Sequence, residues 1–224
     1  MIMLKKIFCL YFVALFLPLN AVANKSAPWV GTSLAGVRCN GGGQGFGPYD
    51  YTLRAGENAK NLEIVELHHF TSAVENLIAG ADGTLEGDLN YTLRAWPNHH
   101  RALLSLIKLQ LNIDSKLIKG KLKTSPECYL QRAINFSPDD IVPYTLYGYY
   151  LRKTEHTEDA VKFYEKAISL DPENEKVAYS YSLVLIDLKQ YEEAVKFAKI
   201  AYHDGKAPMG LKQKLIKLGV WKDE

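Results

Sequence analysis

Two pairs of adjacent histidines, His68-His69 and His99-His100, are the strongest candidates for chemistry in this sequence. Imidazole is a common ligand of zinc and copper, so an accessory role in metal or redox handling is one hypothesis. Neighbouring residues point in different directions on a helix or a strand, so at most one member of each pair can face a shared metal. No H-E-x-x-H spacing accompanies them. We expect structural histidines, with His99 near the start of a helix, and neither a metal nor a cofactor.

Catalytic chemistry has no comparable set of residues behind it. Ser72 and Ser105 lack a nucleophile elbow, and no pair of carboxylates stands where its two pKa values would separate. The glycine-rich run 41–48 has the composition of a phosphate-binding loop, but such loops connect a strand to a helix N-terminus. Here Pro48 and a β-like segment follow the glycines. We therefore expect a non-enzyme in which this run is an irregular loop covering one end of the fold.

Residues 1–23 have the order of features found in a secretory signal peptide. Lys5 and Lys6 precede an apolar run over 7–17, and Ala21-Val22-Ala23 supplies small residues at the cleavage position. The run is shorter than the ~20 apolar residues that span a bilayer, which disfavours a retained anchor. The other alternative is a buried first helix of a cytosolic domain, which the flanking lysines disfavour. We expect an exported protein, periplasmic or secreted, without stable membrane insertion after cleavage.

Cleavage after residue 23 changes the charge balance and the cysteine count. The remaining 201 residues (224 minus 23) carry 25 Lys and Arg (27 minus Lys5 and Lys6) and 25 Asp and Glu, so their net charge is zero. Nucleic acid is then not an expected partner, because phosphate binding needs a basic surface. Two cysteines remain, Cys39 and Cys128, in a compartment where disulfides persist. We expect a Cys39–Cys128 disulfide, and the alternative is two unpaired thiols.

Four prolines divide the rest of the chain into units of similar length. They are Pro97, Pro138, Pro172 and Pro208, at spacings of 41, 34 and 36 residues. A period near 34 indicates stacked pairs of antiparallel helices, which bury their apolar faces against neighbouring pairs and curve around a groove. The chemistry-bearing residues would therefore be positioned by a helical solenoid.

The most regular unit, 141–174, resembles the tetratricopeptide repeat. Its residues fit the pattern W-x2-L-G-x2-Y, then A-x3-F, then P, through Tyr144, Tyr147, Gly148, Leu151, Ala160, Tyr164, Ala167 and Pro172. Gly148 lets the second helix approach closely, and Tyr164 fills the space between two alanines. The unit 175–208 is a second, degenerate repeat. The unit 98–140 is a divergent one, whose extra seven residues (41 minus 34) form a polar, lysine-rich loop at 114–124.

The remaining segments complete a mainly α fold. Residues 209–224 contain apolar residues at helical spacing and are expected to cap the open end of the solenoid as a helix. Residues 24–87 are expected to form an irregular appendage with a β-hairpin of strands 49–54 and 62–67, followed by a short helix that Thr71 or Ser72 caps and that runs through Ile78. Residues 88–96, at the start of the repeat region 88–208, are a candidate second helix of a divergent first unit.

The resemblance implies a non-catalytic adaptor or scaffold that binds a peptide or protein of the cell envelope. In proteins with this repeat, the concave surface is lined by first-helix residues opposite the packing signature. Transferred to this sequence, those residues are Arg101, Lys108, Asn112, Thr145, Tyr149, Arg152, Lys153, Lys176, Tyr179 and Leu183, together with Ser105, Val142, Ser180 and Asp187. The cations among them predict a basic face with tyrosines that stack on a peptide, and the alternative is an ordinary solvated helix face.

Overall fold

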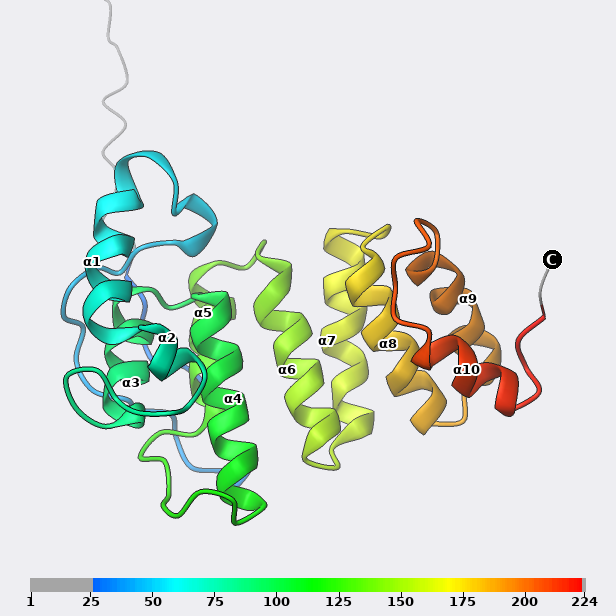
Figure 1. Cartoon of the computed structure of the whole chain (residues 1–224), viewed down its shortest axis with the longest axis horizontal. Coiled ribbons are helices and arrows are strands. Elements are labelled where there is room, and N and C mark those ends of the chain that lie inside the picture. The colour runs from blue at the N-terminus through cyan, green and yellow to red at the C-terminus, as the bar shows by residue number, and fades with distance from the viewer. Residues whose placement is uncertain (1–25, 223–224) are drawn as a thin grey trace, which may run out of the picture.

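The computed structural model describes residues 26–222, and the expected signal peptide lies outside them. The described residues form an elongated stack of helices without a β-sheet (Figure 1). Two 3-10 turns, Tyr51–Leu53 and Gly56–Asn58, precede the α-helices. The α-helices are α1 Ala59–His69, α2 Ser72–Glu75, α3 Leu85–Ala95, α4 His100–Asp114, α5 Pro126–Phe136, α6 Ile141–Lys153, α7 Thr157–Leu170, α8 Glu175–Asp187, α9 Tyr191–Ala201 and α10 Gly210–Lys217.

The proline period sets the point at which each first helix begins. Two residues after Pro97, Pro138 and Pro172, a polar side chain caps the next helix, because it accepts a hydrogen bond from an unpaired amide of the first turn. These caps are His99 on α4, Asp140 on α6 and Asn174 on α8. The prolines thus end one unit, and the caps start the next.

The hairpin of α6 and α7 has the close packing that its sequence predicts. Gly148 faces the ring of Tyr164, and a Cβ added at this glycine would lie 2.4 Å from the ring atom Cε2. Tyr164 is fully enclosed, between Ala160 and Ala167, and its ring stacks on that of Tyr181 in α8 at a centroid distance of 5.6 Å. The aromatic ring therefore joins two neighbouring repeats as well as two helices of one.

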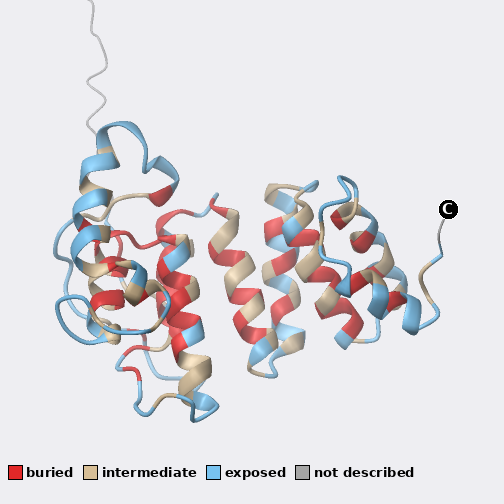
Figure 2. Ribbon diagram, viewed as in Figure 1, coloured by how far each residue is buried: buried red, intermediate tan, exposed pale blue. Residues whose placement is uncertain are grey.

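Each first helix packs on both helices of the unit before it, α6 on α4 and α5 and α8 on α6 and α7. Helix α6 packs on α4 and on α8, whereas in the described part of the chain α7 has no comparable packing on α5 or α9. The stack therefore curves toward the first helices α4, α6 and α8. We call the exposed side of these three helices the inner face. Buried residues lie on the sides of these helices that face their neighbours (Figure 2).

The first unit is a pair of helices, and the predicted β-hairpin is wrong. Helix α1 packs against α3, with the short α2 inserted between them in sequence. Residues 49–54 contain a 3-10 turn, and residues 62–67 lie inside α1. The helix prevails because Leu62, Val65 and His69 recur at helical spacing and face α3, whereas Ile64 and Leu67 remain more than half exposed. The predicted second helix at 88–96 is confirmed as α3.

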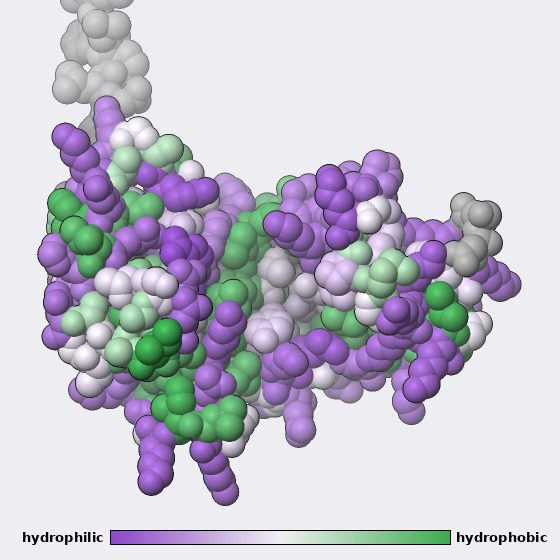
Figure 3. Space-filling model, viewed as in Figure 1, coloured by the Kyte–Doolittle hydropathy of each residue, from purple (hydrophilic) through white to green (hydrophobic). Residues whose placement is uncertain are grey.

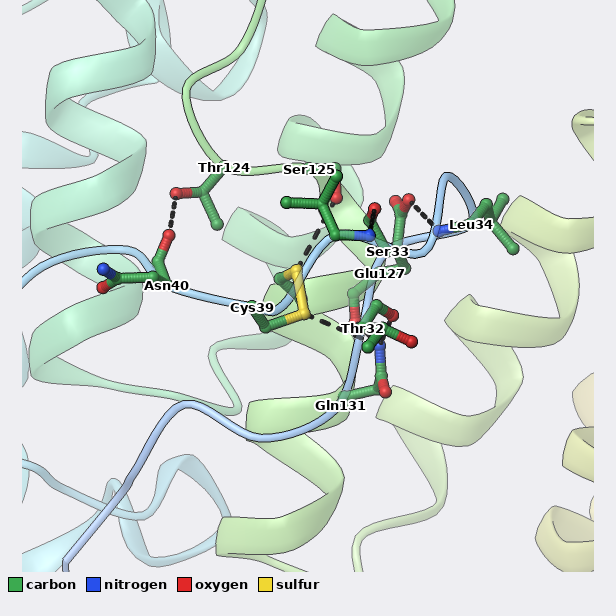
Figure 4. The surroundings of a disulfide bond; sticks show 11 residues. Thr32, Ser33, Leu34, Cys39, Asn40, Thr124, Ser125, Glu127 and Gln131 are labelled. Atoms are coloured by element: carbon green, nitrogen blue, oxygen red, sulfur yellow. Dashed lines mark hydrogen bonds between the residues drawn. A yellow bond between two sulfur atoms is a disulfide. The ribbon is translucent and has the colours of Figure 1, made fainter.

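The N-terminal segment 26–50 lies along the second helices α3 and α5 and is hydrogen-bonded to both of them. The predicted disulfide is confirmed: it joins Cys39 to Cys128 in α5 (Figure 4). Nearby, the Gln131 amide donates to the carbonyl of Thr32. Arg132 is 2% exposed and donates to backbone carbonyls of the segment and of α3. This attachment leaves the inner face uncovered.

The C-terminal helix α10 closes the other end of the described stack. Its Leu211 and Leu215 are fully buried against α8 and α9, while its lysines face outward. Trp221 follows the helix and contacts the ring of Tyr202 edge-on, at a centroid distance of 6.0 Å. Among residues 26–222, no helix is long and apolar enough to cross a membrane.

Candidate functional site

The ten residues proposed for partner binding all lie on the first helices α4, α6 and α8, and each is at least partly exposed. Thr145 and Tyr149 are half-buried on α6, and Tyr179 and Leu183 are half-buried on α8. Half-burial on a helix that also contacts both neighbours leaves one side of each residue open to solvent. Apolar side chains lie at the bottom of the hollow over this part of the molecule (Figure 3). The inner face therefore offers an apolar and aromatic floor.

Ion pairs within the protein reduce the basic character that the sequence predicts for this face. Arg101 of α4 donates from Nε to a Glu75 oxygen at 2.8 Å and from Nη1 to Glu66 at 3.3 Å. Donation of the hydrogen bond to Glu75 raises the pKa of Arg101 above its ordinary value. The same bond lowers the pKa of the Glu75 carboxyl. The arginine is thus bound by carboxylates of α1 and α2, which are elements that the sequence did not place here.

The second arginine of the face is also paired. Arg152 of α6 donates to Asp187 of α8 at 2.6 Å, and Lys214 of α10 reaches the other oxygen of Asp187 at 3.0 Å. Partial burial by itself would raise the pKa of Asp187, but the hydrogen bonds from the two cations lower it. This carboxylate therefore braces three helices along one edge of the inner face. Of the predicted cations, the lysines Lys108, Lys153 and Lys176 remain exposed.

Two pockets flank the floor, one at each end of the inner face. One, of about 290 Å³, lies between α2 and α4 and is lined by Glu75, Asn76, Leu77, Lys108 and Asn112. The other, of about 350 Å³, lies between α8 and the turn before α10, and its lining includes Lys176, Tyr179 and Pro208. Each pocket is large enough to take side chains of a segment lying along the face.

Three further residues of the predicted surface serve the fold. Ser105 is 2% exposed and donates to the backbone carbonyl of Glu75, so its assignment to the surface is wrong. The Ser180 hydroxyl donates to the carbonyl of Lys176 one turn earlier in α8. Asp187 is occupied by the ion pairs described above. Sequence spacing places such residues on a helix face but does not reveal a neighbour that covers or binds them.

His99 has a structural role that its geometry defines closely. Its ring is fully buried, and Nδ1 accepts the hydrogen bond of the Ala102 amide as the cap of α4. An accepting Nδ1 carries no proton, so Nε2 carries the proton and donates it to Glu66 across 3.0 Å. Burial lowers the pKa of His99 despite this carboxylate. The expectation of a structural histidine near a helix start is confirmed.

The other members of the histidine pairs do not converge on a common point. His69 bonds Asp88 at 2.9 Å and His100 bonds Asp140 at 2.8 Å, whereas His68 is exposed on α1. Asp140 also caps α6. Each of these carboxylates is thus tied to a different part of the scaffold. In residues 26–222, no group of three or more His, Cys, Asp or Glu side chains is placed to hold a metal ion.

Sequence reasoning missed the acidic rim of the inner face, formed by Glu66 of α1 and Glu75 of α2. Glu66 falls in the predicted strand 62–67, and Glu75 falls in the predicted short helix that ends at Ile78. The signal that identifies α1 was present in the spacing of Leu62, Val65 and His69, but Ile64 and Leu67 between them favoured an alternating pattern. Glu75 contributes to the surface only because the fold brings α2 next to α4.

Repeated helix pairs with a shared inner face define a helical-repeat protein, and the comparisons specify the repeat. Residues 143–174 match the family model of the tetratricopeptide repeat, so the hairpin of α6 and α7 is a tetratricopeptide repeat. Among solved structures, the chain is similar to the crystal structure of MamA, with a TM-score of 0.45 and 20% identity over 71% of this chain and 81% of that chain. A search of curated proteins finds no match.

Proposed function

We propose that this protein is an exported, non-catalytic adaptor that binds a peptide or protein partner of the cell envelope on its inner face. The observation that carries the proposal is the arrangement of that face. Half-exposed Tyr149, Tyr179 and Leu183 line it, and pockets lie at both ends. The N-terminal segment is fastened to the opposite side by the Cys39–Cys128 disulfide, so it does not occupy the face.

The pairing of the two arginines determines what kind of partner the face suits. A carboxylate partner would have to displace Glu75 from Arg101 or Asp187 from Arg152, so it gains little from either cation. Buried aromatic and aliphatic anchors are instead the main source of affinity at protein interfaces. The proposed partner therefore presents apolar side chains to the floor and polar groups to the lysine and glutamate rim. Its binding should weaken only modestly with salt.

Two features support export as part of the proposal. The disulfide is of a kind that persists in oxidising compartments such as the periplasm. Residues 1–23 have the charge and hydropathy order of a cleavable leader. Mass spectrometry of the protein from fractionated cells should show Asn24 as the N-terminus. An uncleaved product in the cytosol would contradict export.

The binding proposal is tested by capturing partners from an envelope extract with the purified protein and with two matched variants. Tyr149→Ala with Leu183→Ala removes two floor residues and should abolish capture of a partner identified by mass spectrometry. Ile168→Ala with Val195→Ala removes half-buried apolar residues from the second helices α7 and α9 and should retain it. Circular dichroism must show equal helicity in both. Loss in the second variant with retention in the first would refute the proposal.

The alternative from the sequence, a role in metal or redox handling, has no observation in its favour among residues 26–222. Three of the four histidines have carboxylate partners on separate elements, and both cysteines are in the disulfide. Metal analysis of the purified protein tests this alternative directly. A stoichiometric metal that disappears with His68→Ala and His69→Ala would revive it.

A further inference from the structure

The loop between α4 and α5 presents a cluster of lysines that the inner face does not use. We call residues 115–123 the lysine loop. It contains no acidic residue, and its four lysines are exposed and form no ion pair with a described residue; they are Lys116, Lys119, Lys121 and Lys123. The loop projects beyond the neighbouring helix ends (Figure 1). Four positive charges thus stand together within nine residues. The other residues of 24–224 carry slightly more acidic than basic side chains.

The loop is anchored rather than loosely attached. Ile118 packs against the main core, and Leu122 is 7% exposed within it. The amides of Leu117 and Ile118 both donate to the carbonyl of Asn112 at the end of α4, at 2.8 and 3.1 Å. The amide of Lys123 donates to the Glu86 carboxylate of α3. Two apolar residues and three backbone bonds therefore fix which side chains point outward.

Leu117 is the apolar residue that these anchors leave outside. It is 76% exposed, although the loop buries Ile118 next to it. Figure 3 shows apolar side chains beside long hydrophilic ones at this end of the molecule. An anionic polymer alone would bind the lysines but would leave the apolar side chain of Leu117 in water. A surface with anionic groups over an apolar layer suits both kinds of side chain.

We propose that the lysine loop is a peripheral docking element for an anionic lipid surface. The four ammonium groups lie among the headgroups, and Leu117 enters the boundary between headgroups and acyl chains. Lysine suits this role because it is a flexible point charge that needs no fixed partner geometry. Each lysine near an anionic surface strengthens binding about five-fold, so the loop confers reversible attachment and no insertion. This inference does not rest on partner binding at the inner face.

The test is co-sedimentation with vesicles of phosphatidylcholine, with and without phosphatidylglycerol. The chain is prepared from Asn24 onward, because the apolar run at 7–17 would itself bind lipid, and every contact described here lies within 26–222. We expect binding only to the anionic vesicles and a decrease as salt is raised. The variant with all four loop lysines changed to Gln should bind several hundred-fold more weakly. Leu117→Ser should weaken binding several-fold at unchanged charge.

A charge-matched control separates the loop from net charge. Changing Lys162, Lys166, Lys189 and Lys196 to Gln removes the same four charges from exposed positions on or next to α7 and α9. This control should bind as the parent chain does. Equal loss in both quadruple variants, equal binding to neutral vesicles, or a parent chain that binds neither kind would each overturn the proposal. The last outcome would leave an acidic protein surface as the occupant to test. Circular dichroism verifies that all variants are folded.

Discussion

Gly148→Ala tests the packing of the repeat at its closest contact. The new Cβ would lie 2.4, 2.7 and 2.9 Å from three ring atoms of Tyr164. The ring has no room to retreat, since it is 1% exposed and stacks on Tyr181. Overpacking of this kind costs ~1–3 kcal/mol. Alanine also favours a helix over glycine by ~1 kcal/mol, so the net loss of unfolding free energy should be ~0–2 kcal/mol.

The two contributions separate in a double-mutant cycle with Tyr164→Leu, followed by thermal and urea unfolding. Leucine removes the ring atoms that the new Cβ would meet, so Gly148→Ala should become stabilising by ~1 kcal/mol in that background. The coupling energy between the two sites should then be ~1–3 kcal/mol. At about 2–4 °C per kcal/mol for a chain of this length, the change of sign is measurable as a shift in Tm.

Two controls define the result that would refute this reasoning. At Gly210 an added Cβ would lie 3.7 Å from the Tyr179 hydroxyl, an ordinary contact, so Gly210→Ala should change stability little. Thr145→Leu, on the inner face, should be near neutral, whereas Gly148→Leu should be more destabilising than Gly148→Ala. Additive effects of Gly148→Ala and Tyr164→Leu would mean that the two residues do not define the contact between α6 and α7.

Two further predictions concern the N-terminal segment. Replacing Cys39 and Cys128 together by Ser opens a loop with a sequence separation of 89. By the chain-entropy relation, this should lower the free energy of unfolding by about 4 kcal/mol. An unchanged Tm under non-reducing conditions would contradict this prediction. Burial tends to raise the pKa of Asp50, but hydrogen bonds from Thr52, Asn98 and Ser137 lower it from 3.8 to about 2. Its stabilisation is therefore complete above pH ~4 and is lost as pH falls toward 2. Asp50→Asn should remove about 1 kcal/mol of the decrease in unfolding free energy across this window, after allowance for solvent screening, as measured by urea unfolding at each pH. Parallel pH profiles of the parent and the variant would contradict the assignment.

The repeat region could be predicted because its rules are local. Pro138 and Pro172 bracket one unit, and the helices α6 and α7 begin and end within it as the spacing of Gly148 and Tyr164 requires. The start of α5 follows a local rule as well, since Pro126 stands in its first turn, where a helix tolerates proline. Each of these signals involves residues within one helical turn or one repeat, so the sequence alone contains them.

The first unit could not be predicted because tertiary contacts decide its structure. Helix α1 is only weakly amphipathic, because Ile64 and Leu67 are exposed while Glu66 turns inward to bond His99, 33 residues later. The residues predicted for the surface do lie on α4, α6 and α8, but the charge of this surface could not be predicted, since the carboxylates that neutralise Arg101 come from α1 and α2. Charge at a surface depends on partners far apart in sequence, which residue spacing does not reveal.

The central claim is that a partner lies along the inner face, and site-specific photocrosslinking in cells tests it most directly. A photoreactive side chain is placed at Thr145 or Leu183 on the inner face and, as controls, at Lys166 or Lys196 on the second helices. The inner positions should yield a discrete crosslinked product of one mass with an envelope protein, and the controls should not. Products from the second helices alone, with none from Thr145 or Leu183, would contradict the claim.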